Sequence, residues 1–207
     1  MRVLKWLFLS VYFFSEALGV AHLTQPQATA PQVGSTQAHT TQTRSPGASV
    51  QTPMFKIFVH KAARKLEVFA DGKKIHGFKI VLGPEPEGTK LRQGDGKTPE
   101  GVYYVRVKNS KSQFYLSLGL SYPEQHDLQR ALAEKQISKA QYNKLMSAHA
   151  QKLKPPSNTP LGGEIFIHGG GASEGYDWTA GCVALDNPDM KLLFEKIPLG
   201  TEVEILP

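Results

Sequence analysis

Two residues that can do chemistry together stand fourteen positions apart near the end of the chain. His168 begins the segment HGGGASEGYDWTAGCVAL, and Cys182, the only cysteine of the sequence, lies close to its end. A thiol is nucleophilic as the thiolate, and a neighbouring imidazole can accept its proton or, as the imidazolium, lower its pKa. His168 and Cys182 are therefore candidates for the base and the nucleophile of an acyl transfer.

The spacing alone leaves three interpretations of Cys182 open: a buried small hydrophobic residue, an intermolecular disulfide, or a reactive thiol. The glycines around it favour the third, because they leave room for substrate or for close backbone approach. The amides of Gly181 and Cys182 could then stabilise an oxyanion, and a backbone carbonyl could orient the histidine. This interpretation predicts an accessible thiol of lowered pKa that reacts with iodoacetamide below about pH 7.

Strands must position these residues, and alternating apolar and polar side chains predict them along most of the domain. Turn-forming residues, such as those of the loop GDGKTPEG at 94–101, separate the strands. One strand is expected to end directly before His168 and to deliver it. The predicted strands cover residues 55–60, 65–69, 74–82, 102–107, 115–122, 164–167 and 202–206.

Between residues 123 and 152 the pattern becomes helical. Leu128 and Ala131 recur at helical spacing, and Ser138 with Gln141 forms a capping box. A last short helix is expected over 188–197, after which the final strand follows. The sequence therefore predicts a mainly β domain with a helical insertion, which is either a lid over the cleft or packing, and short peripheral helices.

The N-terminal part of the chain divides into two segments outside this domain. Residues 1–21 combine a basic start, a short apolar run and small residues, which is typical of a secretory signal peptide and too short for a membrane anchor, the alternative interpretation. Residues 22–52 are rich in Gln, Thr, Ala, Ser and Pro and predict a disordered linker, with a recognition tail as the alternative. The domain proper is expected at 53–207, exported and peripheral to a membrane at most.

The charge of the domain is modestly basic. Residues 53–207 carry 21 Lys and Arg against 17 Asp and Glu. Such a balance favours anionic surroundings such as a wall polymer or lipid headgroups. The charges are dispersed and are not interleaved with aromatic residues, so we expect no nucleic-acid partner.

The motif His168-Gly169, followed by Thr179-x-Gly181-Cys182, resembles the active-site signature of the L,D-transpeptidase catalytic domain family, also called YkuD. The resemblance extends over nearly all of residues 53–207, and the loop 94–101 and the stretch SLGLSYP resemble a periplasmic, murein-acting subgroup. It implies a β-sandwich whose cysteine attacks a diaminopimelate carbonyl in a peptidoglycan stem peptide, releases D-alanine and forms a thioester. An amine, of the wall or of a lipoprotein lysine, or water then takes the acyl group.

Carried over to this sequence, the resemblance makes Cys182 the nucleophile, His168 the base and later the acid, and the carbonyl of Gly169 the orienting group. The amides of Gly181 and Cys182 become the oxyanion hole. No metal or organic cofactor is expected, and the sequence has neither an HExxH motif nor clustered cysteines.

Three further residues near the cysteine are candidates for contact with substrate. We expect Tyr176, Trp178 and Thr179 to bind it, although the two aromatic residues could equally pack against the core. For Asp177 and for Asp95, a role within a turn is favoured over contact with a ligand.

Position 184 departs from the family pattern, because many members have an arginine there and this chain has Ala184. An arginine could pair with a substrate carboxylate, so its absence leaves the donor geometry and the acceptor open. Three hypotheses remain: a cysteine acyltransferase, a cysteine hydrolase acting as carboxypeptidase, endopeptidase or amidase on the same polymer, and a non-catalytic wall-binding module with a buried thiol.

Overall fold

A computed structural model describes residues 52–172 and 175–207. The signal peptide and nearly all of the linker predicted from the sequence lie outside the described residues. Within them, no helix is long and apolar enough to cross a bilayer. The elements in chain order are β1 (Phe55–His60), β2 (Lys65–Ala70), β3 (Lys73–Lys79), β4 (Gly101–Ser112), β5 (Tyr115–Leu120), α1 (Gln125–Ala133), α2 (Lys139–Ala150), β6 (Phe166–His168), β7 (Val183–Ala184), α3 (Asn187–Lys196) and β8 (Glu202–Leu206).

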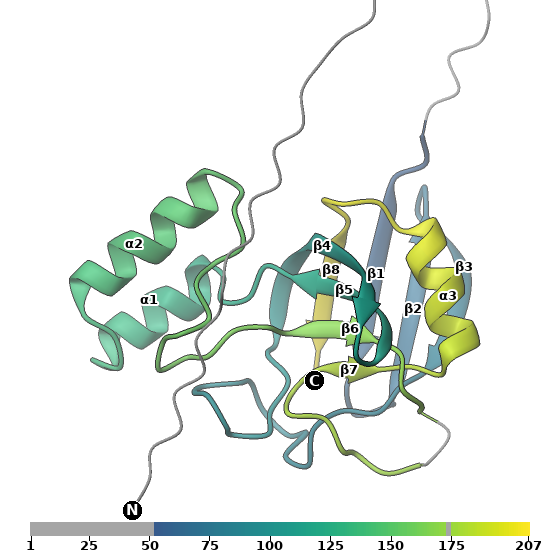
Figure 1. Ribbon diagram of the computed structural model, residues 1–207, viewed down its shortest axis with the longest axis horizontal. Helices are drawn as coiled ribbons and strands as arrows, with labels where there is room; N and C mark the ends of the chain where they lie inside the picture. Colours follow the sequence, from purple (N-terminus) through teal and green to yellow (C-terminus); the bar gives the residue numbers. More distant parts are fainter. Residues whose placement is uncertain (1–51, 173–174) are drawn as a thin grey trace, which may run out of the picture. The chain divides into compact units, whose positions relative to one another are not determined.

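The described strands form one mixed sheet in the order β3-β2-β1-β8-β4-β5-β6-β7, as Figure 1 shows. β1 pairs with β8, and β6 with β7, in parallel, and the other neighbours are antiparallel. β4 joins the two halves of the sheet, because its residues 101–104 pair with β8 and its remaining residues pair with β5. The expected mainly β fold is thus present as a mixed eight-stranded sheet with three helices in the described part.

One hydrophobic core is shared by both halves of the sheet. Alternate residues of β1 and β2 point into it, among them Ile57 and Leu66, which are fully buried. Leu118 of β5 and Ile167 of β6 reach the same core from the other half. Burial of apolar side chains from both halves therefore fixes where β6 and β7 lie.

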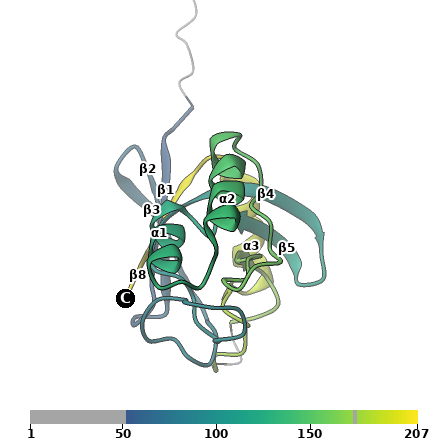
Figure 2. The ribbon, with the colours of Figure 1, turned by 90° about the vertical axis from the view of Figure 1, so that its left-hand side faces the viewer.

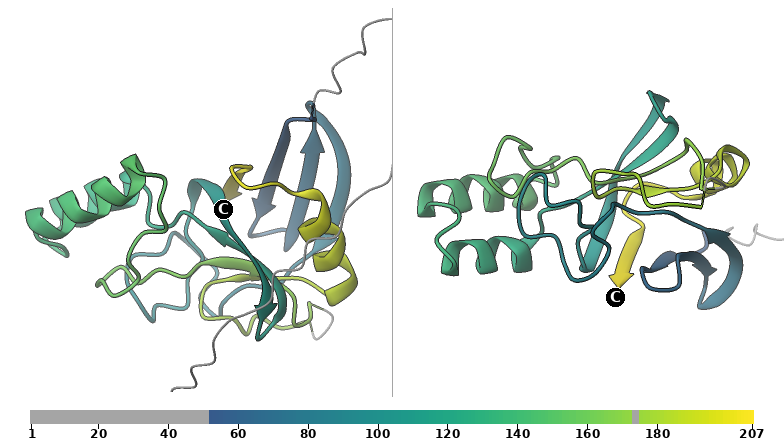
Figure 3. Two further views of the ribbon diagram at one scale, coloured as in Figure 1. Left: turned by 45° about the horizontal axis from the view of Figure 1, so that its top comes forward. Right: turned by 90° about the horizontal axis from the view of Figure 1, so that it is seen from below.

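The helices lie at two places around the sheet. Figures 2 and 3 show α1 and α2 side by side, and Figure 3 shows α3 on the other side of the strands. α1 and α2 enclose a small core of their own around Leu128 and Leu145, whereas Met190 of α3 joins the main core. The predicted capping box of Ser138 and Gln141 is present at the start of α2.

Most strand predictions are confirmed, and the differences lie at strand ends. The predicted strands at 55–60 and 202–206 match β1 and β8. The strand expected at 74–82 ends at Lys79, after which only Val81 continues β pairing, through an isolated bridge to Ala184. β4 is twice as long as the prediction of 102–107, because it pairs with β8 over residues 101–104 and then continues with β5 through a pairing that contains two register irregularities.

The shared core makes a stability prediction. Replacing Leu118, which is fully buried between the two halves, by alanine should lower the free energy of unfolding by about 2–5 kcal/mol. The matched change Leu199→Ala removes the same atoms from a side chain that is 59% exposed, and it should change the unfolding free energy by less than about 0.5 kcal/mol. Denaturant unfolding of both variants measures the difference, and equal effects would contradict the assignment of Leu118 to the core.

Candidate active site

The parallel pairing of β6 and β7 brings the two chemical residues of the sequence together. Ile167 is opposite Val183 and His168 is opposite Ala184, so Cys182 directly precedes the short β7 and lies beside the end of β6. Residues 169–182 form the connection between the two strands. His168 and Cys182 line one cleft of about 450 Å³.

The Cys182 thiol lies against the backbone of β6 and of the residues before it. Its Sγ accepts a hydrogen bond from the Phe166 amide at 3.4 Å and donates one to the Glu164 carbonyl at 3.5 Å. Burial raises the pKa of Cys182 above its ordinary value, although the Phe166 amide and the charge of Lys90 act in the opposite direction. The predicted thiol of lowered pKa is therefore wrong for the substrate-free protein: desolvation outweighs the groups that would stabilise a thiolate.

His168 is held in one tautomer by the backbone. Its Nδ1 is 2.5 Å from the carbonyl oxygen of Gly169, which can only accept, so Nδ1 carries the proton and Nε2 keeps its lone pair. This is the contact that an orienting role of Gly169 requires. Burial lowers the pKa of His168, and the bond to Gly169 opposes that shift. The resting site therefore pairs a neutral thiol with a neutral imidazole.

Aromatic rings hold the imidazole from the side. The Phe114 ring stacks on His168 with centroids 4.6 Å apart, and the Trp178 ring lies at 5.6 Å from both rings. The Trp178 indole also donates to the Gly171 carbonyl at 3.2 Å. Trp178 thus packs against the histidine, which is the structural alternative expected for the aromatic residues, and its contact with substrate stays a prediction. Tyr176 is 57% exposed at the surface of the same connection.

The side chain of Thr179 is used within the turn before the cysteine, and the prediction that it binds substrate stays a prediction. Thr179 is buried, and its hydroxyl donates to the Cys182 carbonyl at 2.8 Å while accepting from the Gly181 amide at 3.1 Å. The Gly181 amide is therefore already bonded, which leaves the Cys182 amide as the oxyanion donor to consider. Gly181 has φ +117°, and a Cβ there would lie 2.4 Å from the Lys97 carbonyl oxygen, so the position requires glycine.

Two carboxylates near the site have structural partners. Asp177 pairs with Arg64, which lies between β1 and β2, and accepts a hydrogen bond from the Leu82 amide at 2.8 Å, after β3. It therefore holds the β6–β7 connection against these two segments and does not close a local turn. Asp95 organises the loop around itself, as the favoured interpretation expected.

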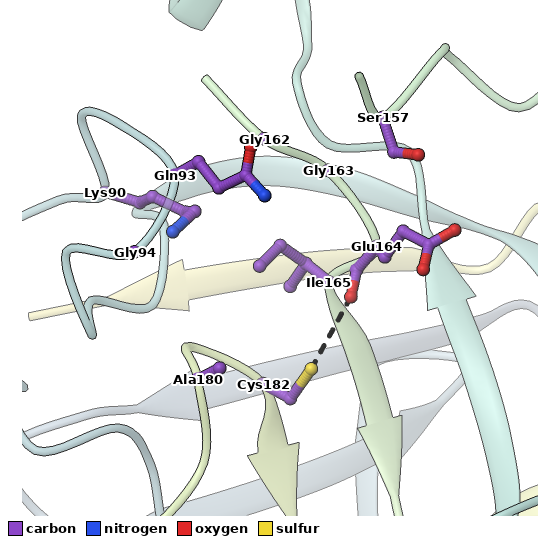
Figure 4. Close-up of a pocket in the computed structure, with 10 residues that line it drawn as sticks. All are labelled: Lys90, Gln93, Gly94, Ser157, Gly162, Gly163, Glu164, Ile165, Ala180 and Cys182. Carbon is purple, nitrogen blue, oxygen red and sulfur yellow. Dashed lines mark hydrogen bonds between the residues drawn. The ribbon is translucent and has the colours of Figure 1, made fainter. Parts of the chain in front are cut away.

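A second cleft, of about 380 Å³, meets the first at Cys182. Figure 4 shows Lys90 and Gln93 on a loop at one side of this second cleft, Glu164 and Ile165 at the other, and Cys182 with its bond to the Glu164 carbonyl. Glu164 borders both clefts. The nucleophile is thus reached from two sides. Residues 52–172 and 175–207 contain no cluster of three or more His, Cys, Asp or Glu side chains able to hold a metal ion.

Sequence reasoning missed Phe114 and Lys90. Phe114 lies at the turn between β4 and β5, and only the pairing of β5 with β6 places it beside His168. Lys90 precedes the glycine-rich loop and gives no sequence signal of burial, yet it is 2% exposed. The position of the Lys90 ammonium beside Cys182 results from the folded loop and cannot be predicted from the sequence.

Known proteins resemble this chain in sequence and in fold. The sequence matches the model of the L,D-transpeptidase catalytic domain, YkuD, over residues 55–205. A search of curated proteins found no match. Among solved structures, the helical cell shape determining protein Pgp2 from Campylobacter jejuni is 23% identical, with 74% of this chain and 47% of that chain covered and a TM-score of 0.50. Bd1075 from Bdellovibrio bacteriovorus is 24% identical, with 73% and 47% covered and a TM-score of 0.49.

An L,D-transpeptidase from Mycobacterium smegmatis is 10% identical, with 75% of this chain and 59% of that chain covered and a TM-score of 0.45. The chain spans about half the length of the Campylobacter and Bdellovibrio proteins. At these identities, the likeness to the Campylobacter structure concerns the fold.

The pKa directions predict how the thiol of the substrate-free protein is alkylated. Because the pKa of Cys182 is raised, the thiolate fraction should be small at neutral pH and should still increase above about pH 8.5, the ordinary midpoint of a thiol. The rate of iodoacetamide labelling, followed by intact mass from about pH 6 to 10, should therefore rise across that whole range. A rate that reaches its plateau below about pH 7 would instead indicate a preformed thiolate.

The hydroxyl of Thr179 can be tested with a nearly isosteric change. Thr179→Val leaves the Cys182 carbonyl and the Gly181 amide without their partner, which should cost about 1–3 kcal/mol of stability. It should also speed alkylation of Cys182, since the turn that buries the thiol is loosened. Thr201→Val removes a hydroxyl bonded to the Pro198 carbonyl and should leave the labelling rate unchanged. Equal labelling in both variants would show that Thr179 does not position the cysteine.

Proposed function

The chain belongs to the L,D-transpeptidase catalytic domain family, and from this premise we propose that it transfers the acyl group of a peptidoglycan stem peptide through a thioester on Cys182. The observation that carries the proposal is the meeting of two clefts at this thiol, one of which also contains His168. A transferase must bind an acyl donor and an acceptor at one nucleophile, and two clefts provide separate approaches for them.

The first half-reaction begins from the neutral pair. As Sγ attacks the carbonyl carbon of the donor peptide, its proton passes to Nε2 of His168, whose other nitrogen is fixed by the Gly169 carbonyl. The carbonyl π bond breaks, and the resulting oxyanion accepts a hydrogen bond from the Cys182 amide. The C–N bond then breaks, His168 returns its proton to the leaving amine, and a thioester remains on Cys182.

The second half-reaction reverses these steps with a new nucleophile. An acceptor amine loses a proton to Nε2 of His168 and attacks the thioester carbon, after which the C–S bond breaks and Sγ is reprotonated. The cysteine and histidine are regenerated, so acyl transfer consumes no other reactant. A wall amine or a lipoprotein lysine fits the acceptor position.

The raised pKa of Cys182 and the lowered pKa of His168 suit these proton-transfer steps. A thiol that is neutral at rest and an imidazole that is neutral at rest form a nucleophile and a base in the states that proton transfer needs. Stacking by Phe114 restricts rotation of the His168 ring, which lines the cleft that also contains Cys182. Desolvation, which keeps the thiol protonated, also strengthens every hydrogen bond to the developing oxyanion.

Water is the second candidate acceptor, because of Ala184. This residue is fully buried in a small apolar cluster with Val81 and Ala172, so the position that carries an arginine in many family members contributes no charge here. A less tightly defined donor or acceptor geometry favours release of the acyl group to water. The enzyme would then be a carboxypeptidase, endopeptidase or amidase of the same polymer.

The remaining expectations follow from the family and the sequence. We place the enzyme in the periplasm of a bacterium, exported by residues 1–21 and tethered through residues 22–52. The two halves of the sheet that share one core support a sandwich arrangement, with α1 and α2 as an insertion into it. Catalysis is proposed to need no metal or organic cofactor.

The test is mass spectrometry of the products formed from purified disaccharide-tetrapeptide by the full chain and by Cys182→Ala. Cross-linked dimers formed only by the wild type would establish transfer, and shortened monomers without dimers would identify water as the acceptor. The variant should lose at least about a thousandfold in rate, because the covalent route is removed. Products formed equally by the variant would overturn the proposal, and their absence with both proteins would favour a wall-binding module.

A further inference from the structure

Two lysines of this domain are buried to the same degree and paired with a carboxylate in the same way. Lys61 is 1% exposed and lies 2.7 Å from Glu100, and Lys90 is 2% exposed and lies 2.8 Å from Asp95. Burial of an ammonium group is costly, so each of its N–H donors is expected to find an acceptor. The two lysines differ in how many acceptors the protein supplies.

Lys61 has a full set of partners. Besides Glu100, its Nζ donates to the Gly88 carbonyl at 2.6 Å and to the Thr98 carbonyl at 3.2 Å. An ammonium group has three N–H donors, and the folded chain therefore accounts for all of them. This lysine is a structural residue of the loops that follow β1 and β3.

Lys90 has one acceptor fewer among the described residues. Its Nζ donates to Asp95 Oδ1 at 2.8 Å and to the Arg92 carbonyl at 3.1 Å, which leaves one donor. The side chain lines the cleft that it shares with Cys182, Gln93 and Glu164, as Figure 4 shows. The third N–H is thus available at the wall of this cleft.

The loop that carries Lys90 is held in place from several sides. Asp95 accepts hydrogen bonds from the amides of Leu91 and Arg92 at 2.7 and 3.0 Å, so the loop closes around this carboxylate. Arg130 of α1 donates to the Lys90 carbonyl at 2.9 Å. The position of the ammonium is therefore set before any ligand arrives, which lowers the entropy cost of binding.

Two charged residues border this cleft. Lys90 does so with one donor unused, and Glu164, on the opposite side, forms an exposed ion pair with Lys154 at 2.7 Å. Ala184 lies in an apolar cluster and supplies no second cation to the site. A charge-assisted bond from a partly desolvated ammonium is stronger than one between neutral groups.

We propose that Lys90 binds a carboxylate of the peptide that enters this second cleft, and that Asp95 and Arg130 position it. That the carboxylate belongs to a peptidoglycan stem peptide rests on the proposed function. The preference of the cleft for a carboxylate does not rest on it, because it follows from the third donor of Lys90. Lys90 is accordingly a residue that determines specificity.

Two alkylating reagents of nearly equal size test the inference without substrate. Iodoacetate carries a carboxylate and iodoacetamide a neutral amide, and both react with the Cys182 thiolate. The ratio of their rate constants cancels the effect of any change in the thiol pKa. In Lys90→Met the ratio of iodoacetate to iodoacetamide should fall about tenfold relative to the wild type, because the charge-assisted bond is lost.

Lys61→Met is the matched control, since it removes the same charge and a comparable buried ion pair away from the cysteine. It should keep the wild-type ratio, and Lys90→Arg should keep most of it. An unchanged ratio in Lys90→Met, or an equal fall in Lys61→Met, would overturn the inference. If Lys90→Met does not fold, the wild-type ratio is compared with that of N-acetylcysteine, and a ratio no higher than that of the free thiol has the same meaning.

The readout separates this inference from the proposed function. Labelling needs only the folded site, so the ratio can respond to Lys90 even if the wild type leaves the tetrapeptide unchanged. Where turnover is observed, Lys90→Met should raise KM more than it lowers kcat, because binding and not bond-making is affected.

Discussion

Close packing of backbone on backbone around the cysteine is the constraint on which the rest of the site depends. A Cβ at Gly181 would lie 2.4 Å from the Lys97 carbonyl oxygen, and one at Gly83 would lie 2.0 Å from the Gly96 carbonyl oxygen. The first contact joins the turn before Cys182 to the loop at 94–101. The second joins the segment around Gly83 to the same loop. Gly181 and Gly83 therefore allow three chain segments to come into contact around the cysteine.

Desolvation decides the electrostatics of the resting site. Lys90 and the Phe166 amide favour a thiolate, but burial outweighs them, and burial likewise keeps His168 neutral. The same environment that withholds charge from the free enzyme is able to stabilise it when a substrate carbonyl becomes an oxyanion, because fixed dipoles act strongly where water is excluded. In the proposed mechanism, proton transfer from Sγ to Nε2 is therefore coupled to attack and does not precede it.

The fold was predictable from the sequence to the extent that it rests on local patterns. Alternation located β1 and β8, and capping residues located α2, because these signals lie within a few adjacent residues. The presence of Cys182 and His168 in one cleft was predictable from the motif, but the contacts of Thr179 and Trp178 were not. Thr179 contacts the turn at the cysteine, and Trp178 contacts the ring of His168. The tertiary fold determines both contacts, so the residue types alone do not predict them.

The same distinction bears on the helical segment, for which the sequence left a lid and packing open. Asp127 of α1 is fully buried and accepts from the Tyr103 hydroxyl at 3.1 Å, while Arg130 of the same helix donates to the Lys90 carbonyl. A lid must open at a low cost in free energy. Opening α1 would instead leave the Asp127 carboxylate unpaired and release the loop that borders the cleft. The helix is therefore better understood as an anchor for Lys90, so that the proposed selection of substrate by Lys90 would depend on an element that lies outside the sheet.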